Sequence, residues 1–401
     1  MDGQSAHAVP DIERMNAYRL GRLRAELRKR DLAGIVVVDA INLRYATGSR
    51  NMQLWTLRSP ARYAFVATEG PVVMFEFAGC HHLLNGLKTI DEIRTATGWF
   101  YFTSGGRLAD KAKRWAGEIA DLVVKHGGGN KRLAVDRINP EGHAELTRLG
   151  IEVIDGQESL EHARCIKSED EILCLKEAIA VCERGFEAME QAALTPGRSE
   201  NEIWSRLHEV NIAGGGEYIE TRLLSSGPRS NPWFQEANER VVNAGDLIAC
   251  DSDLIGRHGY FADMSRTFLC GEGKATGAQR SLFQLAEEQI RHNMALLKPG
   301  TTLQEVAEQS WDMPDLYLPH RYMSLVHGAG LCGEYPYVPY RQDFALKGYK
   351  GSIEAGMTLC VESFIGASTG GEGVKLEELV LVTDSGAVPL TSHPYDQRLA
   401  G

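Results

Sequence analysis

The stretch Asp251-Ser-Asp253-Leu-Ile-Gly-Arg-His-Gly-Tyr260-Phe-Ala-Asp263 places three carboxylates in two strand-like runs joined by a glycine-containing turn. Asp251 and Asp253 are two residues apart, so an extended strand would point both side chains to the same face. Asp is depleted in strands and is costly to bury without a partner. Because the preceding run Leu247-Ile-Ala-Cys250 is apolar, the sequence predicts that a cation compensates these acids.

The same pattern recurs further along the chain. Glu362 follows the apolar run Met357-Thr-Leu-Cys-Val361, and Glu377 follows Gly373-Val-Lys-Leu376. His327 lies where Ser324-Leu-Val enters the glycine-rich segment Gly328-Ala-Gly330. Three Asp, two Glu and one His suit iron, manganese or zinc, and bridging carboxylates can hold two such ions close together.

Taken singly, each of these six residues has a plainer interpretation. A lone Asp in a strand is more often at an edge, and a His beside Gly is usually a satisfied polar residue. The metal hypothesis therefore depends on all six together, because each one interrupts an apolar run. Asp251 and Asp253 remain alternatives to each other, since one could bridge two ions while the other only supports it.

The chain of 401 residues is longer than one hydrophobic core usually covers, so two domains are expected. Before residue 165, helices predicted over 13–31 and 109–126 alternate with strands at 34–39, 63–68, 72–77 and 132–136, and 42–48 is predicted as a loop. This indicates an α/β domain over 1–164. Ser168 and Ser199 then open helices of an α+β domain over 165–401. Its strands are predicted at 220–226, 247–253, 260–269, 322–327, 357–365 and 374–382, and its later helices at 278–297 and 302–310.

Composition narrows the classes of function. With 43 Lys plus Arg against 54 Asp plus Glu, the net charge of −11 gives the chain no general reason to bind nucleic acid or anionic lipid. No run approaches the roughly 18 apolar residues of a membrane span. The start of the chain lacks the pattern of a secretion signal, and the eight cysteines form no CxxC pair. Free thiols in a reducing cytoplasm are the expectation.

The ligand order Asp, Asp, His, Glu, Glu resembles that of the creatinase/prolidase/methionine aminopeptidase family, as does Gly259-Tyr-Phe-Ala-Asp263-Met-Ser-Arg-Thr267. The resemblance covers the whole chain. It implies a creatinase-like α/β domain over 1–164 and a catalytic domain with the "pita-bread" fold over 165–401. It also implies two bound divalent ions, with iron expected and manganese or zinc as alternatives, and a homodimer.

Several positions depart from the family's peptidases. Their first ligand, eleven residues before the second Asp, falls on Ser252, which is flanked by Asp251 and Asp253. This doubled acid is similar to the branch of the family that cleaves dimethylsulfoniopropionate. Long similar stretches run through 44–47, 51–55, 133–136, 219–224, 227–235 and 359–362. Two peptidase histidines fall on Phe234 and Glu334, so amide hydrolysis is disfavoured.

The resemblance to the lyase branch implies a β-elimination on a small zwitterionic or carboxylate substrate. That branch has an Asp as its base where this chain has Gly333, so Glu334 is predicted to take the proton, unless it only caps a turn. Aromatic faces would hold the positive charge of the substrate. Tyr322 is the first candidate, five residues before His327 on the same predicted strand, and could also orient a proton. The remaining candidates for this role are Trp233, Tyr45 and Trp55.

Two other functions stay open. A hydrolase of a small C–N substrate, such as an Xaa-Pro dipeptidase or a creatinase-like enzyme, would use Glu334 to activate water. A binding protein that has lost catalysis is the third hypothesis, although carboxylates clustered without a metal would repel one another.

Overall fold

The computed structural model describes residues 8–400, which divide into one unit over Val9–Arg164 and a second unit from Cys165 onward. The first seven residues, on which the expectation of no secretion signal partly depends, lie outside the described residues. Within the described chain, no helix combines the length and the apolar content needed to cross a bilayer.

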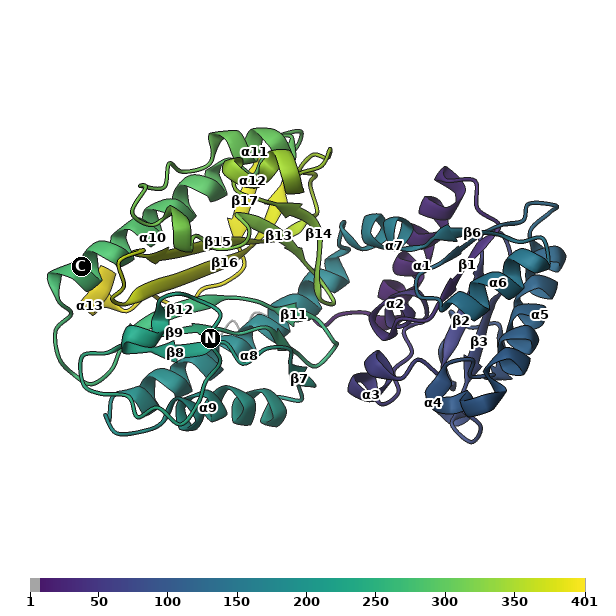
Figure 1. Cartoon of the computed structure of the whole chain (residues 1–401), viewed down its shortest axis with the longest axis horizontal. Helices are drawn as coiled ribbons and strands as arrows, with labels where there is room; N and C mark the ends of the chain where they lie inside the picture. The colour runs from purple at the N-terminus through teal and green to yellow at the C-terminus, as the bar shows by residue number, and fades with distance from the viewer. Residues whose placement is uncertain (1–7, 401) are drawn as a thin grey trace, which may run out of the picture. The chain divides into compact units, whose positions relative to one another are not determined.

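The N-terminal unit is a six-stranded mixed sheet with helices on both faces, as the α/β pattern predicts (Figure 1). Two helix groups cover the sheet: α1 (Ile12–Lys29), α2 (Ala40–Thr47) and α7 (Gln157–Arg164) on one face, and α5 (Leu108–His126) and α6 (Pro140–Arg148) on the other. Two short helices, α3 (Gln53–Arg58) and α4 (Tyr101–Ser104), complete the unit. The strand order is β4 (Glu92–Thr95), β3 (Val72–Glu76), β2 (Tyr63–Ala67), β1 (Gly34–Val37), β5 (Arg132–Val135), β6 (Glu152–Asp155).

The loop predicted over 42–48 is wrong, because this segment belongs to helix α2. The Asp39 side chain accepts hydrogen bonds from the backbone amides of Ile41 (2.9 Å) and Asn42 (3.2 Å), which caps the first turn. Gly48 ends the helix in the left-handed conformation, with φ 74°. Both capping signals stand in the sequence, Asp39 at the end of the predicted strand 34–39 and Gly48 at the end of the predicted loop.

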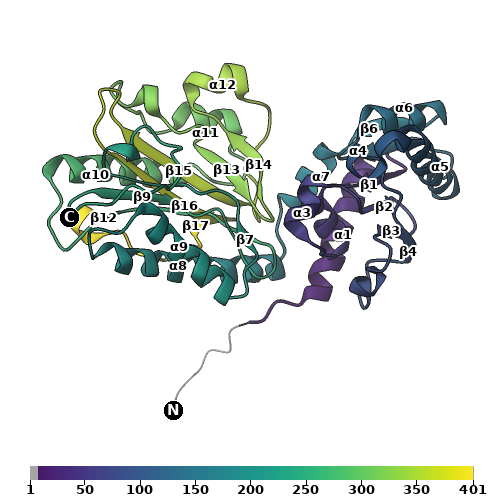
Figure 2. The same ribbon diagram turned by 60° about the horizontal axis from the view of Figure 1, so that its bottom comes forward.

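The C-terminal unit begins with two helices that lie side by side, α8 (Glu169–Ala193) and α9 (Glu200–Ala213) (Figures 1 and 2). Ser168 with Glu171, and Ser199 with Glu202, form reciprocal capping boxes that fix where these helices start, as predicted. Helix α10 (Gly277–Ala295) packs along the central strands, and α11 (Leu303–Gln309), α12 (Arg341–Lys347) and α13 (Gln397–Ala400) are shorter.

The centre of this unit is an eight-stranded antiparallel sheet. Its order is β14 (Gly333–Val338), β13 (Val326–Ala329), β15 (Thr358–Gly366), β16 (Gly373–Thr383), β12 (Ser265–Leu269), β9 (Leu247–Asp251), β8 (Leu224–Ser226), with β17 (Gly386–Pro389) also paired to β16. A small sheet joins β11 (Phe261–Ala262), β10 (Leu254–Ile255) and β7 (Tyr218–Ile219). The run predicted over 260–269 is therefore two strands that belong to different sheets.

The register of the large sheet determines where the acidic residues meet. Ser265 pairs with Asp251 on one side and with Glu377 on the other, and Glu377 pairs with Glu362. Directly paired residues in antiparallel strands project from the same face, so this row crosses four strands on one surface. His327 pairs with Cys360, two residues before Glu362, which brings the imidazole to the same face.

Candidate metal centre

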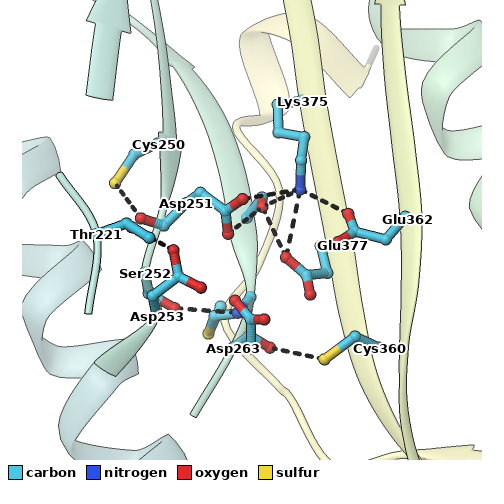
Figure 3. A network of polar contacts seen from close by, with 12 residues as sticks. Thr221, Cys250, Asp251, Ser252, Asp253, Asp263, Cys360, Glu362, Lys375 and Glu377 are labelled. Carbon is cyan, nitrogen blue, oxygen red and sulfur yellow. Dashed lines mark hydrogen bonds and ion pairs between the residues drawn. The ribbon is translucent and has the colours of Figure 1, made fainter. Parts of the chain in front are cut away.

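The six predicted metal ligands lie together in the C-terminal unit. Figure 3 shows the five acids among them. The Nε2 atom of His327 lies 3.2 Å from Glu362 Oε1, 3.7 Å from Asp263 Oδ2 and 3.9 Å from Glu377 Oε1. One ligand atom from each of Asp263, His327, Cys360 and Glu377 falls within 4.8 Å of the others, and the same holds for Asp251, Asp253 and Asp263. Asp263 thus belongs to both groups and joins them.

The backbone that places Asp251 and Asp253 in this cluster is not the single extended strand that was expected. Asp251 ends strand β9, whereas Asp253 follows it in the left-handed region with φ 39°, so the two do not share one extended strand. Asp tolerates this conformation better than most residues. The Thr221 hydroxyl donates a hydrogen bond to Asp253 Oδ2 and helps to hold the carboxylate beside Asp251.

The Lys375 ammonium lies among the acids of this cluster, in contact with Asp251, Glu362 and Glu377. Its Nζ donates to Glu362 Oε2 (2.6 Å) and lies 3.2 Å from Asp251 Oδ2 and 3.3 Å from Glu377 Oε2. A hydrogen bond to Ser265 Oγ (2.6 Å) completes its surroundings. The ammonium is fully buried, and the three carboxylates raise its pKa well above the ordinary value even though burial alone would lower it.

Burial and mutual repulsion raise the pKa values of the three Asp residues of the cluster. Burial raises the pKa of Asp251 to about 6, against the opposing pull of Lys375. Burial together with neighbouring carboxylates raises the pKa values of Asp253 and Asp263 well above the ordinary value. A bound cation would oppose these shifts, because positive charge nearby favours the ionised form of a carboxylate.

Two oxygen atoms provide a direct test of whether a metal fits. Asp263 Oδ1 and Glu377 Oε1 are buried, and neither has a hydrogen-bond partner among the described residues. Such orphaned acceptors are rare and costly in folded proteins. Lys375 occupies the other oxygen of Glu377, which leaves Oε1 toward His327. The donor set therefore fits a divalent cation.

His327 is oriented for the same purpose. Its Nδ1 lies 3.0 Å from the carbonyl oxygen of Gly328 and can donate to it, so Nε2 points at the carboxylates. An outer hydrogen bond of this kind is the usual partner of a metal-binding imidazole. In the metal-free protein, burial lowers the pKa of His327, but the hydrogen bond and charge of Glu362 outweigh it and raise the pKa to about 9.

Aromatic side chains lie next to the cluster. The Tyr322 ring centre is 4.5 Å from Lys375 Nζ, and that of Trp233 is 5.9 Å away. Phe234 stacks on Tyr322 with the ring centres 5.2 Å apart, is 46% exposed, and has φ 69°. The premise that Tyr322 shares a strand with His327 is wrong, because β13 begins only at Val326, where pairing with β14 and β15 starts.

Glu334 lies in a different setting from the metal ligands. Its buried carboxylate forms an ion pair with the buried ammonium of Lys167. Glu334 sits on β14, opposite Gly328, and the neighbouring Gly333 offers no side chain. An ion pair in this position favours the structural alternative over the role of a base.

Two of the predicted substrate-binding residues belong to the N-terminal unit. The Tyr45 ring is buried there, its hydroxyl donates to the carbonyl of Ala163 (2.8 Å), and the Arg19 guanidinium lies 5.8 Å from its ring centre. Trp55 is partly buried and packs edge-on against Phe77 (5.7 Å) and Phe102 (6.1 Å). These contacts give Tyr45 a packing role and leave part of Trp55 accessible.

Sequence reasoning missed two members of the cluster, Lys375 and Cys360. Each lies two residues before a predicted Glu ligand in the same strand, so each projects from the same face as that ligand. The sequence contained this signal, but both residues stand inside apolar runs. Cys360 also fits the general expectation of a buried thiol. Burial together with the charge of Glu377 raises its pKa well above the ordinary value.

The fold and this oxygen-rich centre define the chain as a metalloenzyme of the pita-bread class. The family comparison agrees: residues 173–384 match the metallopeptidase family M24, and residues 19–166 match the creatinase/prolidase N-terminal domain. The chain therefore belongs to metallopeptidase family M24, and the predicted family and fold are confirmed.

Relatives show where the chain lies within the family. It is 40% identical to dimethylsulfoniopropionate lyase DddP of Roseovarius nubinhibens over 98% of this chain and 89% of that protein. The corresponding lyase of Roseobacter denitrificans is 38% identical over the same shares. Among solved structures, dipeptidase PepE from Mycobacterium ulcerans superposes with a TM-score of 0.74 at 22% identity, covering 96% of this chain and 97% of that one. The prolidase from Pyrococcus horikoshii OT3 gives 0.72 at 19%, covering 94% and 99%.

Proposed function

We propose that this chain is a metal-dependent carbon–sulfur lyase that cleaves dimethylsulfoniopropionate, or a close zwitterionic analogue, into dimethyl sulfide and acrylate. The observation that carries the proposal is the similarity of 40% and 38% to two dimethylsulfoniopropionate lyases along nearly the whole chain. The third Asp of the cluster and the aromatic residues beside it support the same assignment.

The reaction is a β-elimination: a base removes a proton from the carbon next to the carboxylate, and the sulfonium leaves as a neutral thioether. A divalent ion, when bound, supplies Lewis acidity that binds the carboxylate and stabilises the negative charge developing beside it. Asp251, Asp253, Asp263, His327, Glu362 and Glu377 would hold that ion.

The chain's own aromatic residues position the positively charged end. The Tyr322 and Trp233 rings lie 4.5 and 5.9 Å from the Lys375 ammonium, and this proximity to a positive charge supports such a role for them. The half-exposed ring of Phe234 extends this wall outward. Burial raises the pKa of Tyr322 well above the ordinary value, so its phenol keeps its proton and can orient a substrate oxygen.

We propose two ions rather than one. Five ionised carboxylates and the single ammonium of Lys375 leave four negative charges when His327 is neutral, and two divalent ions balance them. Asp263, common to both donor groups, would bridge them. We expect iron for these oxygen and imidazole donors, with zinc or manganese as alternatives.

The decisive experiment measures dimethyl sulfide in the headspace above metal-loaded protein and dimethylsulfoniopropionate, with His327→Ala as the control. Release well above that control supports the lyase. Absence of release, together with liberation of an amine from an Xaa-Pro dipeptide or a creatine analogue, would instead support the hydrolase. Calorimetric binding of the zwitterion with no turnover would support the non-catalytic binding protein.

We also propose a homodimer that acts on small molecules in the cytoplasm, without a nucleic-acid or membrane partner. An exposed apolar surface on the N-terminal unit favours association with a second copy, since Tyr101, Phe102, Met52 and Leu54 are each more than half exposed. The structure places none of the eight cysteines in a disulfide bond, which suits a reducing compartment. Light scattering would give the mass, and Phe102→Glu should lower it if this surface pairs the subunits.

A further inference from the structure

Cys360 lies inside the cluster of candidate ligands, on the central strand β15. It is fully buried, it pairs with His327 on the neighbouring strand, and it projects from the same face as Glu362. Its Sγ atom falls within 4.8 Å of one ligand atom from each of Asp263, His327 and Glu377. Figure 3 shows the thiol pointing toward Asp263, where its contact with the backbone carbonyl oxygen measures 4.0 Å.

The two orphaned oxygen atoms belong to this same group of four. Asp263 Oδ1 and Glu377 Oε1 have no hydrogen-bond partner among the described residues, and both side chains are at least nine-tenths buried. The Nε2 atom of His327 faces both carboxylates, at 3.7 Å from Asp263 Oδ2 and 3.9 Å from Glu377 Oε1. Two oxygens, one nitrogen and one sulfur thus converge on a common point.

We propose that the Cys360 sulfur is a ligand of the metal ion held by Asp263, His327 and Glu377. The inference rests on the metal centre of the proposed function and deepens it. A sulfur donor shifts the preference of the site toward iron, cobalt or zinc and away from manganese or magnesium. On binding, the metal–sulfur bond replaces the S–H bond, the proton leaves to solvent, and no electron is transferred.

Cys250 provides a matched control from the same region. It is equally buried and directly precedes the candidate ligand Asp251, but its sulfur contacts only the backbone carbonyl oxygen of Asp251, at 3.8 Å, among the hydrogen bonds of the described residues. Adjacent residues of a strand project from opposite faces, so Cys250 points away from the centre. It is also absent from both groups of candidate ligands.

The experiment loads the full chain with Co²⁺ and records the near-ultraviolet spectrum, where a thiolate bound to cobalt gives a strong charge-transfer band. We expect the band in the wild type and in Cys250→Ser, and its loss in Cys360→Ser with the ligands of oxygen and nitrogen intact. The affinity for Co²⁺ relative to Mn²⁺ should fall by roughly tenfold in Cys360→Ser. A wild type without the band, or a Cys360→Ser protein that retains it, overturns the proposal.

A second measurement needs no variant, in case Cys360→Ser fails to fold. X-ray absorption of the zinc-loaded wild type should contain a sulfur shell at about 2.3 Å. A zinc site with only oxygen and nitrogen neighbours, or a protein that binds no metal, contradicts the proposal. The outcome is separate from activity: dimethyl sulfide release without sulfur ligation refutes only the ligand, and sulfur ligation without release refutes only the lyase.

Discussion

Replacement of Lys375 by Met should destabilise the metal-free protein strongly, because it removes the ammonium and keeps the length of the side chain. Three buried carboxylates, those of Asp251, Glu362 and Glu377, lie within 3.3 Å of Nζ. Breaking a buried ion pair by deleting one partner costs about 3 to 5 kcal/mol. For a domain of this size, that loss corresponds to a fall in the melting temperature of roughly 6 to 20 °C.

Metal should offset much of this loss. Divalent ions held by Asp251, Glu362 and Glu377 would supply positive charge to the carboxylates that Lys375 contacts, so the variant and the wild type should differ less when both are loaded. Calorimetric melting with a chelator, and again with Co²⁺, compares the two states directly. Lys350→Met, which removes a charge from an exposed lysine, is the matched control and should leave both melting temperatures nearly unchanged.

The result that refutes this reasoning is a metal-free Lys375→Met protein that melts with the wild type. The carboxylates would then be neutralised by their own protons, and Lys375 would not be the compensating charge of the cluster. A variant that loses as much stability in the loaded state as in the metal-free state would also be inconsistent, because the metal would not be sharing the same acids.

Three further outcomes follow from the geometry. The first concerns pH. Folding raises the pKa of His327 from 6.5 to about 9, so its contribution to stability is fully present below pH 6.5 and is lost as the pH rises through 9. Folding raises the pKa of Asp251 from 3.8 to about 6, so Asp251 also lowers stability as the pH rises, over that lower range. Urea unfolding of the metal-free protein should therefore show a loss of at most about 3 kcal/mol between these limits, reduced in His327→Gln, and a gain in stability with pH would contradict the cause. Glu334→Gln leaves Lys167 buried without its carboxylate and should lower the free energy of unfolding by about 3 to 5 kcal/mol. The double variant with Lys167→Met should recover most of this stability. A loss of turnover without a loss of melting temperature would instead make Glu334 the base. Phe234→Gly should raise KM for the sulfonium substrate roughly 2- to 30-fold, because it deletes one aromatic face. The variant should keep or improve the stability of the fold, because φ 69° suits glycine. An unchanged KM would show that Phe234 does not contact the substrate.

Much of the fold was accessible from local sequence signals. Capping boxes at Ser168 and Ser199 fixed two helix starts, and continuous apolar runs located the central strands. The predicted ends of strands were wrong where pairing between distant strands sets those ends. Strand β13 begins at Val326, where its pairing with Val338 of β14 and with Val361 of β15 starts, and no local pattern near Tyr322 encodes that limit. The helix over Ala40–Thr47 was missed because its signals, Asp39 and Gly48, lie at its two ends.

The candidate site shows a further limit, which has a physical cause. Acids that interrupt apolar runs can be recognised in the sequence as candidate ligands, because an unpaired buried carboxylate is costly at any position. A lysine or a cysteine in such a run cannot be recognised in this way, because a long aliphatic stem or a small thiol is compatible with an apolar strand. Their importance comes only from register: Lys375 and Cys360 share a face with Glu377 and Glu362, and the pairing of Glu362 with Glu377 then brings all four side chains to one centre. In a strand, the residues two positions from a buried acid are therefore part of the same site, and their chemistry determines which cation the acids hold.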